Sequence, residues 1–311
     1  YYTIKFRNAD SGEDYTHHIA ESNGGGVWTK NSDGFIYCKL DDNHRPSKMY
    51  LHNTSGAETD DVLIFEENDP GFFMGADKSQ SGDWIIIDIH DHQTSEAWLV
   101  PSNNAHQSPQ LVAPRQTGIE YSLDEGGGFL YILTNRDNAS DFKIMKAPVE
   151  NPQVEHWRDL VTHKSGCLIL SHVVFHEYLV RLEREDGLPR IVIHRLIDGE
   201  EHAIEFDEEA YSLGLGGAYE FDTETIRFTY SSMTTPSQTY EYNMRTRQRQ
   251  LLKTQEVPSG HNIDDYVTKR LQATGHDGEL VPISLIHHKH TKCDGSAPCL
   301  LYGYGAYGMS I

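Results

Sequence analysis

The feature that most constrains the fold is a sequence pattern that returns five times at nearly even spacing. Apolar segments rich in β-branched and aromatic residues begin near Phe35, Trp84, Phe129, Tyr178 and Thr225, at intervals of 49, 45, 49 and 47 residues. Each segment is preceded by a similar short one and is followed by a polar turn and two more. Val, Ile, Tyr, Phe, Trp and Thr between Gly, Asp, Asn and Pro are typical of β-strands, so each repeat predicts four strands.

Four strands every 45–50 residues are typical of a β-propeller, whose blades are four-stranded sheets. The segment WIIIDI, residues 84–89, is apolar at successive positions, so we expect both of its faces to be buried. A blade stacked between two other blades provides that environment. The alternative is a β-sandwich with irregular loops, which would not keep so even a spacing. The sequence therefore predicts a mainly β fold with a β-propeller.

The repeats account for five complete blades over about residues 22–257. Residues 1–19 are predicted to add two strands of an earlier blade, which makes about five and a half blades. Propellers have about 4–8 blades, and because the repeats start in the middle of a blade we expect an incomplete ring that lacks its amino-terminal blades. The Gly-Gly-Gly runs at 24–26 and 126–128 are interpreted as turns.

The rhythm of the repeats stops after residues 258–262. Residues 264–290 predict a β-hairpin with its turn at Asp277-Gly278, because alternating apolar residues flank an Asp-Gly pair. Residues 296–308 predict one more strand and a loop. We therefore divide the chain into an incomplete propeller domain, residues 1–257, and the start of a second domain, residues 258–311.

The net charge indicates which classes of partner the protein can bind, and the cysteine content indicates the cellular compartment. The chain has 26 basic and 47 acidic residues, a formal net charge of −21, which opposes nucleic-acid binding and favours cationic partners. Four cysteines without a CxxC pair favour a reduced, cytoplasmic protein. No apolar run approaches the roughly 20 residues of a membrane span, so no membrane partner is predicted.

Three kinds of local motif could indicate a dinucleotide site, a metal site or a serine-hydrolase triad. Gly303, Gly305 and Gly308 form a G-x-G-x-x-G pattern, but no βαβ unit surrounds it and no acidic residue follows, so a dinucleotide site is not predicted. His287, His288 and His290 precede two cysteines without zinc spacing, so we predict no metal and no cofactor. No G-x-S-x-G elbow occurs, so the residues by themselves nominate no Ser–His–Asp triad.

Several segments together resemble the prolyl oligopeptidase family of serine peptidases. They are YSLDEGGGFLYILTNRDNASDFKIMKAP (121–148), YSSMTTPSQTYEYNM (230–244), LLKTQEVPSG (251–260), DGELVPISLIHHK (277–289) and LLYGYGAYG (300–308). Within the family the chain is most similar to the oligopeptidase B branch, also called protease II. That branch has a small residue followed by Tyr-Gly where this chain has Ala306, Tyr307 and Gly308. Prolyl oligopeptidases proper tend to have Gly-Phe-Asn there.

The resemblance implies a seven-bladed propeller that caps an α/β-hydrolase domain. The nucleophile, acid and histidine of the family lie downstream of the YGYG segment, so we expect these 311 residues to be inactive by themselves. Tyr304 matches the family's side-chain oxyanion donor, and Tyr307 matches an aromatic residue lining the pocket for the residue before the cut. The alternative for both tyrosines is simple packing in a β-loop.

The branch implies cleavage of short peptides after Arg or Lys, with the propeller excluding folded proteins. The partners predicted on this basis are short basic peptides. Two alternatives remain beside this function: a propeller that only binds a ligand or partner, and a peptidase that cuts after proline.

Overall fold

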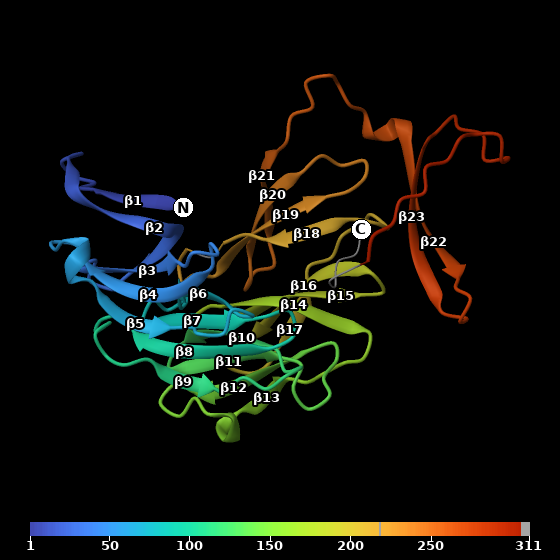
Figure 1. Ribbon diagram of the computed structural model, residues 1–311. Helices are drawn as coiled ribbons and strands as arrows, with labels where there is room; N and C mark the ends of the chain where they lie inside the picture. The colour runs from blue at the N-terminus through green and yellow to red at the C-terminus, as the bar shows by residue number, and fades with distance from the viewer. Residues whose placement is uncertain (218, 306–311) are drawn as a thin grey trace. The chain divides into compact units, whose positions relative to one another are not determined.

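The computed structural model describes residues 1–217 and 219–305, and in this range its regular structure is almost entirely β (Figure 1). The described residues contain no α-helix, only the short 3₁₀ turns η1 (Glu58–Asp60), η2 (Val154–His156) and η3 (Ile263–Asp265). They form two compact units: unit 1 comprises residues 1–165, 173–176 and 219–221, and unit 2 comprises the other described residues.

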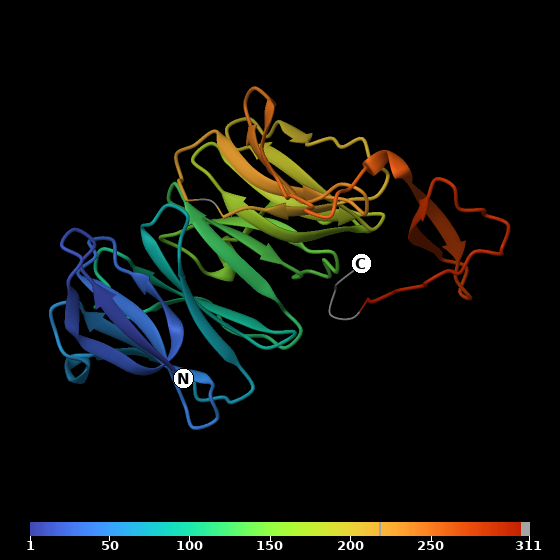
Figure 2. The ribbon, with the colours of Figure 1, turned by 90° about the horizontal axis from the view of Figure 1, so that it is seen from above.

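Unit 1 contains three antiparallel sheets that follow one another along the chain (Figures 1 and 2). The first consists of β1 (Tyr2–Arg7), β2 (Asp14–Trp28), β3 (Gly34–Leu40), β4 (Pro46–Asn53) and β5 (Val62–Glu66). The second consists of β6 (Phe73–Lys78), β7 (Trp84–His90), β8 (Ser95–Pro101) and β9 (Gln110–Ala113). The third consists of β10 (Tyr121–Gly126), β11 (Phe129–Thr134), β12 (Lys143–Pro148) and β13 (Arg158–Val161).

Unit 2 contains most of a fourth sheet and all of a fifth, followed by a two-stranded hairpin. The fourth sheet consists of β14 (Cys167–Val174), β15 (Tyr178–Glu185), β16 (Leu188–Arg195) and β17 (Glu201–Ala203). The fifth consists of β18 (Ser212–Leu215), β19 (Thr225–Ser231), β20 (Gln238–Asn243) and β21 (Arg249–Thr254). The hairpin pairs β22 (Tyr266–Thr274) with β23 (Leu280–His288).

The repeat read from the sequence is confirmed by these sheets, because β3, β7, β11, β15 and β19 begin at or next to the five expected positions. Within each sheet the strands are hydrogen-bonded in chain order, as in a propeller blade. Strand β7 has the burial that its unbroken apolar run predicted, with Ile85, Ile86, Ile87 and Ile89 buried.

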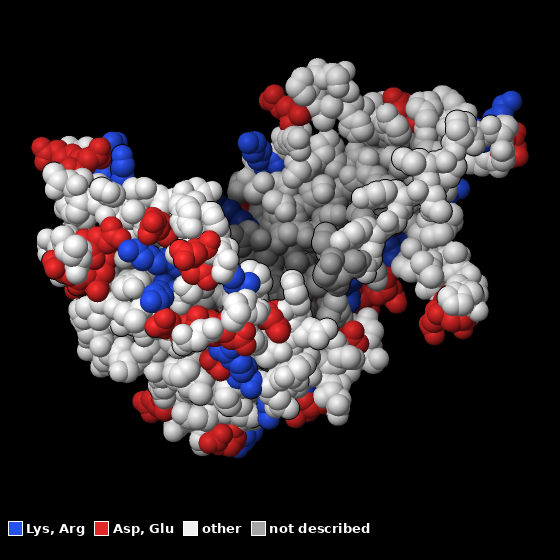
Figure 3. Space-filling model, viewed as in Figure 1, with Lys and Arg blue, Asp and Glu red and all other residues white. Residues whose placement is uncertain are grey.

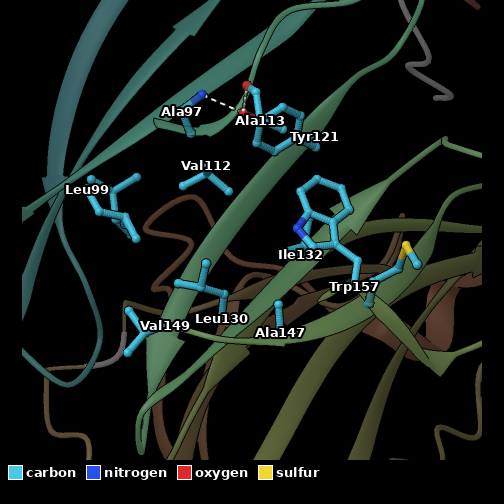
Figure 4. Packing of buried hydrophobic residues seen from close by; sticks show 12 residues of the cluster. Ala97, Leu99, Val112, Ala113, Tyr121, Leu130, Ile132, Ala147, Val149 and Trp157 are labelled. Carbon is cyan, nitrogen blue, oxygen red and sulfur yellow. Dashed lines mark hydrogen bonds between the residues drawn. The ribbon is translucent and has the colours of Figure 1, made fainter. Parts of the chain in front are cut away.

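The core of unit 1 lies between successive sheets rather than at the centre of one sheet. Figure 4 shows the cluster shared by the second and third sheets, in which Ala97 and Leu99 of β8 face Tyr121, Leu130 and Ile132. Trp157 also belongs to it and is 4% exposed, with its indole N–H donating to the backbone oxygen of Pro152 at 2.8 Å. A second cluster links the first and second sheets in the same way. Burial on both faces explains why these strands lack polar alternation.

Two expectations about the amino-terminal region are wrong. Residues 1–19 do not form a separate blade: β1 pairs with the first part of β2, whose last part pairs with β3, so all belong to one five-stranded sheet. Glycines 24–26 do not form a turn but lie inside β2, next to a shift in register between Ser22 and Gly26. At 126–128 the expected turn is present, with Gly127 and Gly128 at φ +62° and +82°.

Candidate functional site

The segment that carries the predicted site follows the hairpin of unit 2. Strands β22 and β23 pair without a register shift from Tyr266↔His288 to Thr274↔Leu280, as the sequence predicted. Gly278 has φ +90° in the turn, and the amide of Gly275 donates to the Glu279 carbonyl at 2.7 Å. At the open end of the hairpin, Lys289 pairs with Asp265 at 2.7 Å. The chain that leaves this end is the one that reaches Tyr304.

Tyr304 lies in an irregular segment and is 45% exposed. The strand expected within residues 296–308 is absent from its described part, 296–305. A strand needs a neighbour to pair with its N–H and C=O groups, and no described strand is paired with this segment. Leu300 and Leu301 are accordingly 91% and 84% exposed.

Of the two tyrosines singled out by the sequence, the structure describes Tyr304. The hydroxyl of Tyr304 has no hydrogen-bond partner among the described residues. Tyr307 lies outside the described residues. Tyr302, two positions before Tyr304, is 74% exposed.

His287 and His288 end strand β23, and His290 lies in the polar turn that follows. The rings of His288 and His290 are 5.2 Å apart, but the backbone N–H of His290 donates to Nδ1 of His288 at 3.2 Å. Among the described residues, no group of three or more His, Cys, Asp or Glu side chains is placed to hold a metal ion. All four cysteines, Cys38, Cys167, Cys293 and Cys299, are free thiols.

Unit 2 also contains an open cleft of about 550 Å³ that the sequence did not reveal. Its walls come from the segment after β17, from strands β19, β20 and β21, and from residues 255–263 between β21 and the hairpin. Glu208 and Arg249 are among its charged lining residues. They are about 40 positions apart in the chain and belong to no local motif, so no pattern in the sequence connects them.

The charged surface is mixed in character. Figure 3 shows acidic side chains in several groups over the visible face, with basic side chains beside some of them. No helix in the described part of the chain has the length and hydropathy to cross a membrane.

Comparison with known proteins shows similarity along the whole chain. A curated relative, dipeptidyl aminopeptidase BI of Pseudoxanthomonas mexicana, is 34% identical over all of this chain and 43% of its own length. Protease 2 of Moraxella lacunata is 29% identical over 99% of this chain and 44% of its own length. The solved structure of oligopeptidase B from Leishmania major superposes with a TM-score of 0.93 at 28% identity, covering all of this chain and 45% of that one.

The chain therefore spans less than half the length of the relatives it matches. The family model of the prolyl oligopeptidase N-terminal beta-propeller domain matches residues 1–255, which contain the five blade sheets. The blades, the even repeat and this match agree, and the chain belongs to the prolyl oligopeptidase N-terminal β-propeller family.

Proposed function

We propose that the chain is part of a serine-type oligopeptidase of the oligopeptidase B kind, which cleaves short peptides after Arg or Lys. Residues 1–257 are its propeller domain, and residues 258–311 are the beginning of its α/β-hydrolase domain. The propeller limits access to small substrates. The observation that carries the proposal is that similarity to a peptidase extends over the entire chain, whereas the propeller match ends at residue 255.

In this proposal Tyr304 is the side-chain donor of the oxyanion hole. When the nucleophile attacks the scissile carbonyl, the oxygen gains negative charge, and a phenol O–H aimed at it stabilises the transition state. The exposed hydroxyl of Tyr304, without an internal partner among the described residues, supports this role. The serine, acid and histidine belong to the downstream part of the hydrolase domain. Tyr307 lines the pocket for the residue before the scissile bond.

Specificity for basic residues is supported by the net charge of −21, which attracts cationic peptides. Fluorogenic peptides with Arg, Lys, Pro or Phe before the leaving group test it on the protein that carries the downstream region. We expect cleavage after Arg and Lys and little after Pro. Preference for Pro would move the protein to the prolyl oligopeptidase branch, and absence of any hydrolysis would favour a propeller that only binds partners.

A dipeptidyl aminopeptidase is the second candidate, because the curated relative of that name shares 34% identity with this chain. An enzyme of this type requires a free substrate amino group, whereas an endopeptidase accepts a blocked one. Each fluorogenic peptide is therefore tested with a free and with an acetylated amino terminus. Equal cleavage of both forms supports the oligopeptidase, and loss of cleavage on acetylation supports the aminopeptidase.

A reducing, cytoplasmic location completes the proposal and is supported by the four free thiols. The partners are short basic peptides, with neither nucleic acid nor a membrane among them.

A further inference from the structure

The cleft of unit 2 holds a negative charge, on Glu208, that no Lys or Arg of the described residues neutralises. The carboxylate of Glu208 accepts hydrogen bonds from the hydroxyls of Tyr230 at 2.7 Å, Thr235 at 2.7 Å and Thr234 at 3.4 Å. Burial raises the pKa of Glu208, but hydrogen bonds from the side chains of Ser232, Thr235, Tyr230 and Thr234 together lower it below its ordinary value. Among the described residues Glu208 has no Lys or Arg partner. Neutral donors therefore keep an ionised carboxylate at this side of the cleft.

The same cleft holds a guanidinium group, on Arg249, that pairs with no carboxylate in the described part of the chain. Arg249 lies over the rings of Phe206 and Tyr240, 5.2 Å from each centroid, and donates to the backbone oxygen of Glu205 at 3.2 Å. No carboxylate among the described residues pairs with it. By contrast, several arginines of unit 2 each pair with a carboxylate, namely Arg181, Arg190, Arg195, Arg227, Arg245 and Arg247. A guanidinium has five N–H donors, so most donors of Arg249 remain available.

Aromatic rings connect the two charged groups. The ring of Tyr230, whose hydroxyl binds Glu208, stacks on Phe206 at 4.9 Å and 11°, and Phe206 contacts Arg249. Glu208 and Arg249 thus mark two ends of an apolar floor. A planar guanidinium can present a fork of N–H donors to a carboxylate.

We propose that this cleft binds short peptides as zwitterions, with the free α-carboxylate on Arg249, the α-ammonium on Glu208 and a side chain over the rings. Asp207 also lines the cleft, and a simple anion or cation would satisfy only one of Glu208 and Arg249. The volume of about 550 Å³ is within the range of small-molecule sites, and Gln238, Gln255 and Asn262 offer amide groups to a peptide backbone. The ligand class rests on the proposed peptidase function, because short peptides with free carboxylates are the products of such an enzyme.

The test is calorimetric titration of the chain with the dipeptide Gly-Phe and two blocked forms. N-acetyl-Gly-Phe lacks the ammonium group, and Gly-Phe amide lacks the carboxylate. We expect Gly-Phe to bind and each block to weaken binding by about tenfold or more, the usual effect of losing a charge-assisted hydrogen bond. Lack of Gly-Phe binding at millimolar concentration, or equal binding of all three forms, would overturn the proposal. Binding of inorganic phosphate as tight as that of Gly-Phe would also overturn it.

Two substitutions assign the two ends of the ligand. In Arg249→Gln, Gly-Phe and Gly-Phe amide should bind equally, while N-acetylation should still weaken binding. In Glu208→Gln, Gly-Phe and N-acetyl-Gly-Phe should bind equally, while amidation should still weaken binding. Glutamine retains an acceptor for the hydroxyls around residue 208, and circular dichroism confirms folding. Arg227→Gln is the matched control. Arg227 lies on the face of β19 opposite to Tyr230 and pairs with Glu241 at 3.4 Å. Equal effects of Arg227→Gln and Arg249→Gln would contradict the assignment.

Failure of this inference is distinguishable from failure of the proposed function. The titration needs no hydrolysis, so an active peptidase whose cleft does not bind Gly-Phe refutes the inference alone. Binding by a protein whose intact form hydrolyses no peptide refutes the proposed function alone.

Discussion

The hydroxyl of Tyr121 accepts a hydrogen bond from the backbone N–H of Ala97 at 2.6 Å. It also donates to the carbonyl of Ala113 at 2.7 Å. Ala97 and Ala113 face each other in strands β8 and β9, where the register shifts between Ala97 and Trp98. The Tyr121 side chain, from the third sheet, thus provides the hydrogen-bond partner of one N–H and one C=O group at the register shift of the second sheet (Figure 4). Blades of unit 1 are joined by this polar bridge as well as by apolar packing.

Tyr121→Phe should lower the free energy of unfolding by about 1–3 kcal/mol, because a buried N–H and a buried C=O lose their partner while the ring remains. Thermal or denaturant unfolding measures the loss. Tyr50→Phe is the control, since Tyr50 is only partly buried and its hydroxyl bonds to no described residue. Similar losses for both variants would mean that the bridge contributes nothing specific.

Gly26→Ala should destabilise the protein by about 1–3 kcal/mol, the usual cost of overpacking. A Cβ at residue 26 would overlap the ring of Phe35 and lie 2.5 Å from the carbonyl oxygen of Ile36. Gly25→Ala should be neutral or slightly stabilising, because nothing lies within 4 Å of a Cβ there. Chemical denaturation of both variants measures the difference, and a neutral Gly26→Ala would show that β2 adapts at its register shift.

Asp124→Asn should stabilise the protein at neutral pH. Burial raises the pKa of Asp124 to about 6, although its Oδ1 accepts hydrogen bonds from the amides of Gln80 and Glu125. The folded protein therefore holds this proton more tightly than the unfolded chain does. The stability due to Asp124 is present below about pH 4 and is lost as the pH rises through about 6.

Asparagine keeps the acceptor and removes the charge, so the gain should be small at pH 4 and reach roughly 1–3 kcal/mol at pH 7.5. Unfolding curves of both proteins across this pH range test the expectation. If the two curves ran parallel, Asp124 would be ionised in the fold at no cost.

Tyr304→Phe should lower kcat by roughly 10²–10³ in the protein that carries the downstream hydrolase region, the usual effect of losing one oxyanion donor. KM should change much less, because the hydrogen bond strengthens mainly in the transition state. Tyr302→Phe, two residues earlier, is the control and should be nearly silent. The same small loss for both variants would reduce Tyr304 to a packing residue.

The sequence predicted the blades because their period arises from local chemistry. Apolar β-formers and turn residues recur every 45–50 residues, and each blade closes within its own repeat by pairing strands that are neighbours in the chain. The Asp277-Gly278 turn was predictable for the same reason, since a hairpin needs only adjacent strands and a residue that tolerates positive φ.

The errors concern features that depend on more distant neighbours. Glycines 24–26 look like a turn but lie in a strand, because close approach of Phe35 and Ile36 requires the absence of a side chain at residue 26. The strand expected within residues 296–308 is absent from the described part, 296–305, because a strand exists only where another strand pairs with it.

The residue pattern was thus sufficient to predict the propeller repeat, and the family resemblance nominated Tyr304 as a site candidate. Tertiary structure alone decided that the hydroxyl of Tyr121 joins two sheets and that Glu208 and Arg249 face one cleft without pairing. The difference arises from how far apart in the chain the interacting residues are. Strand pairing within a blade follows nearest neighbours in the chain, whereas a cleft is set by side chains from separate strands, whose positions depend on how those strands pack.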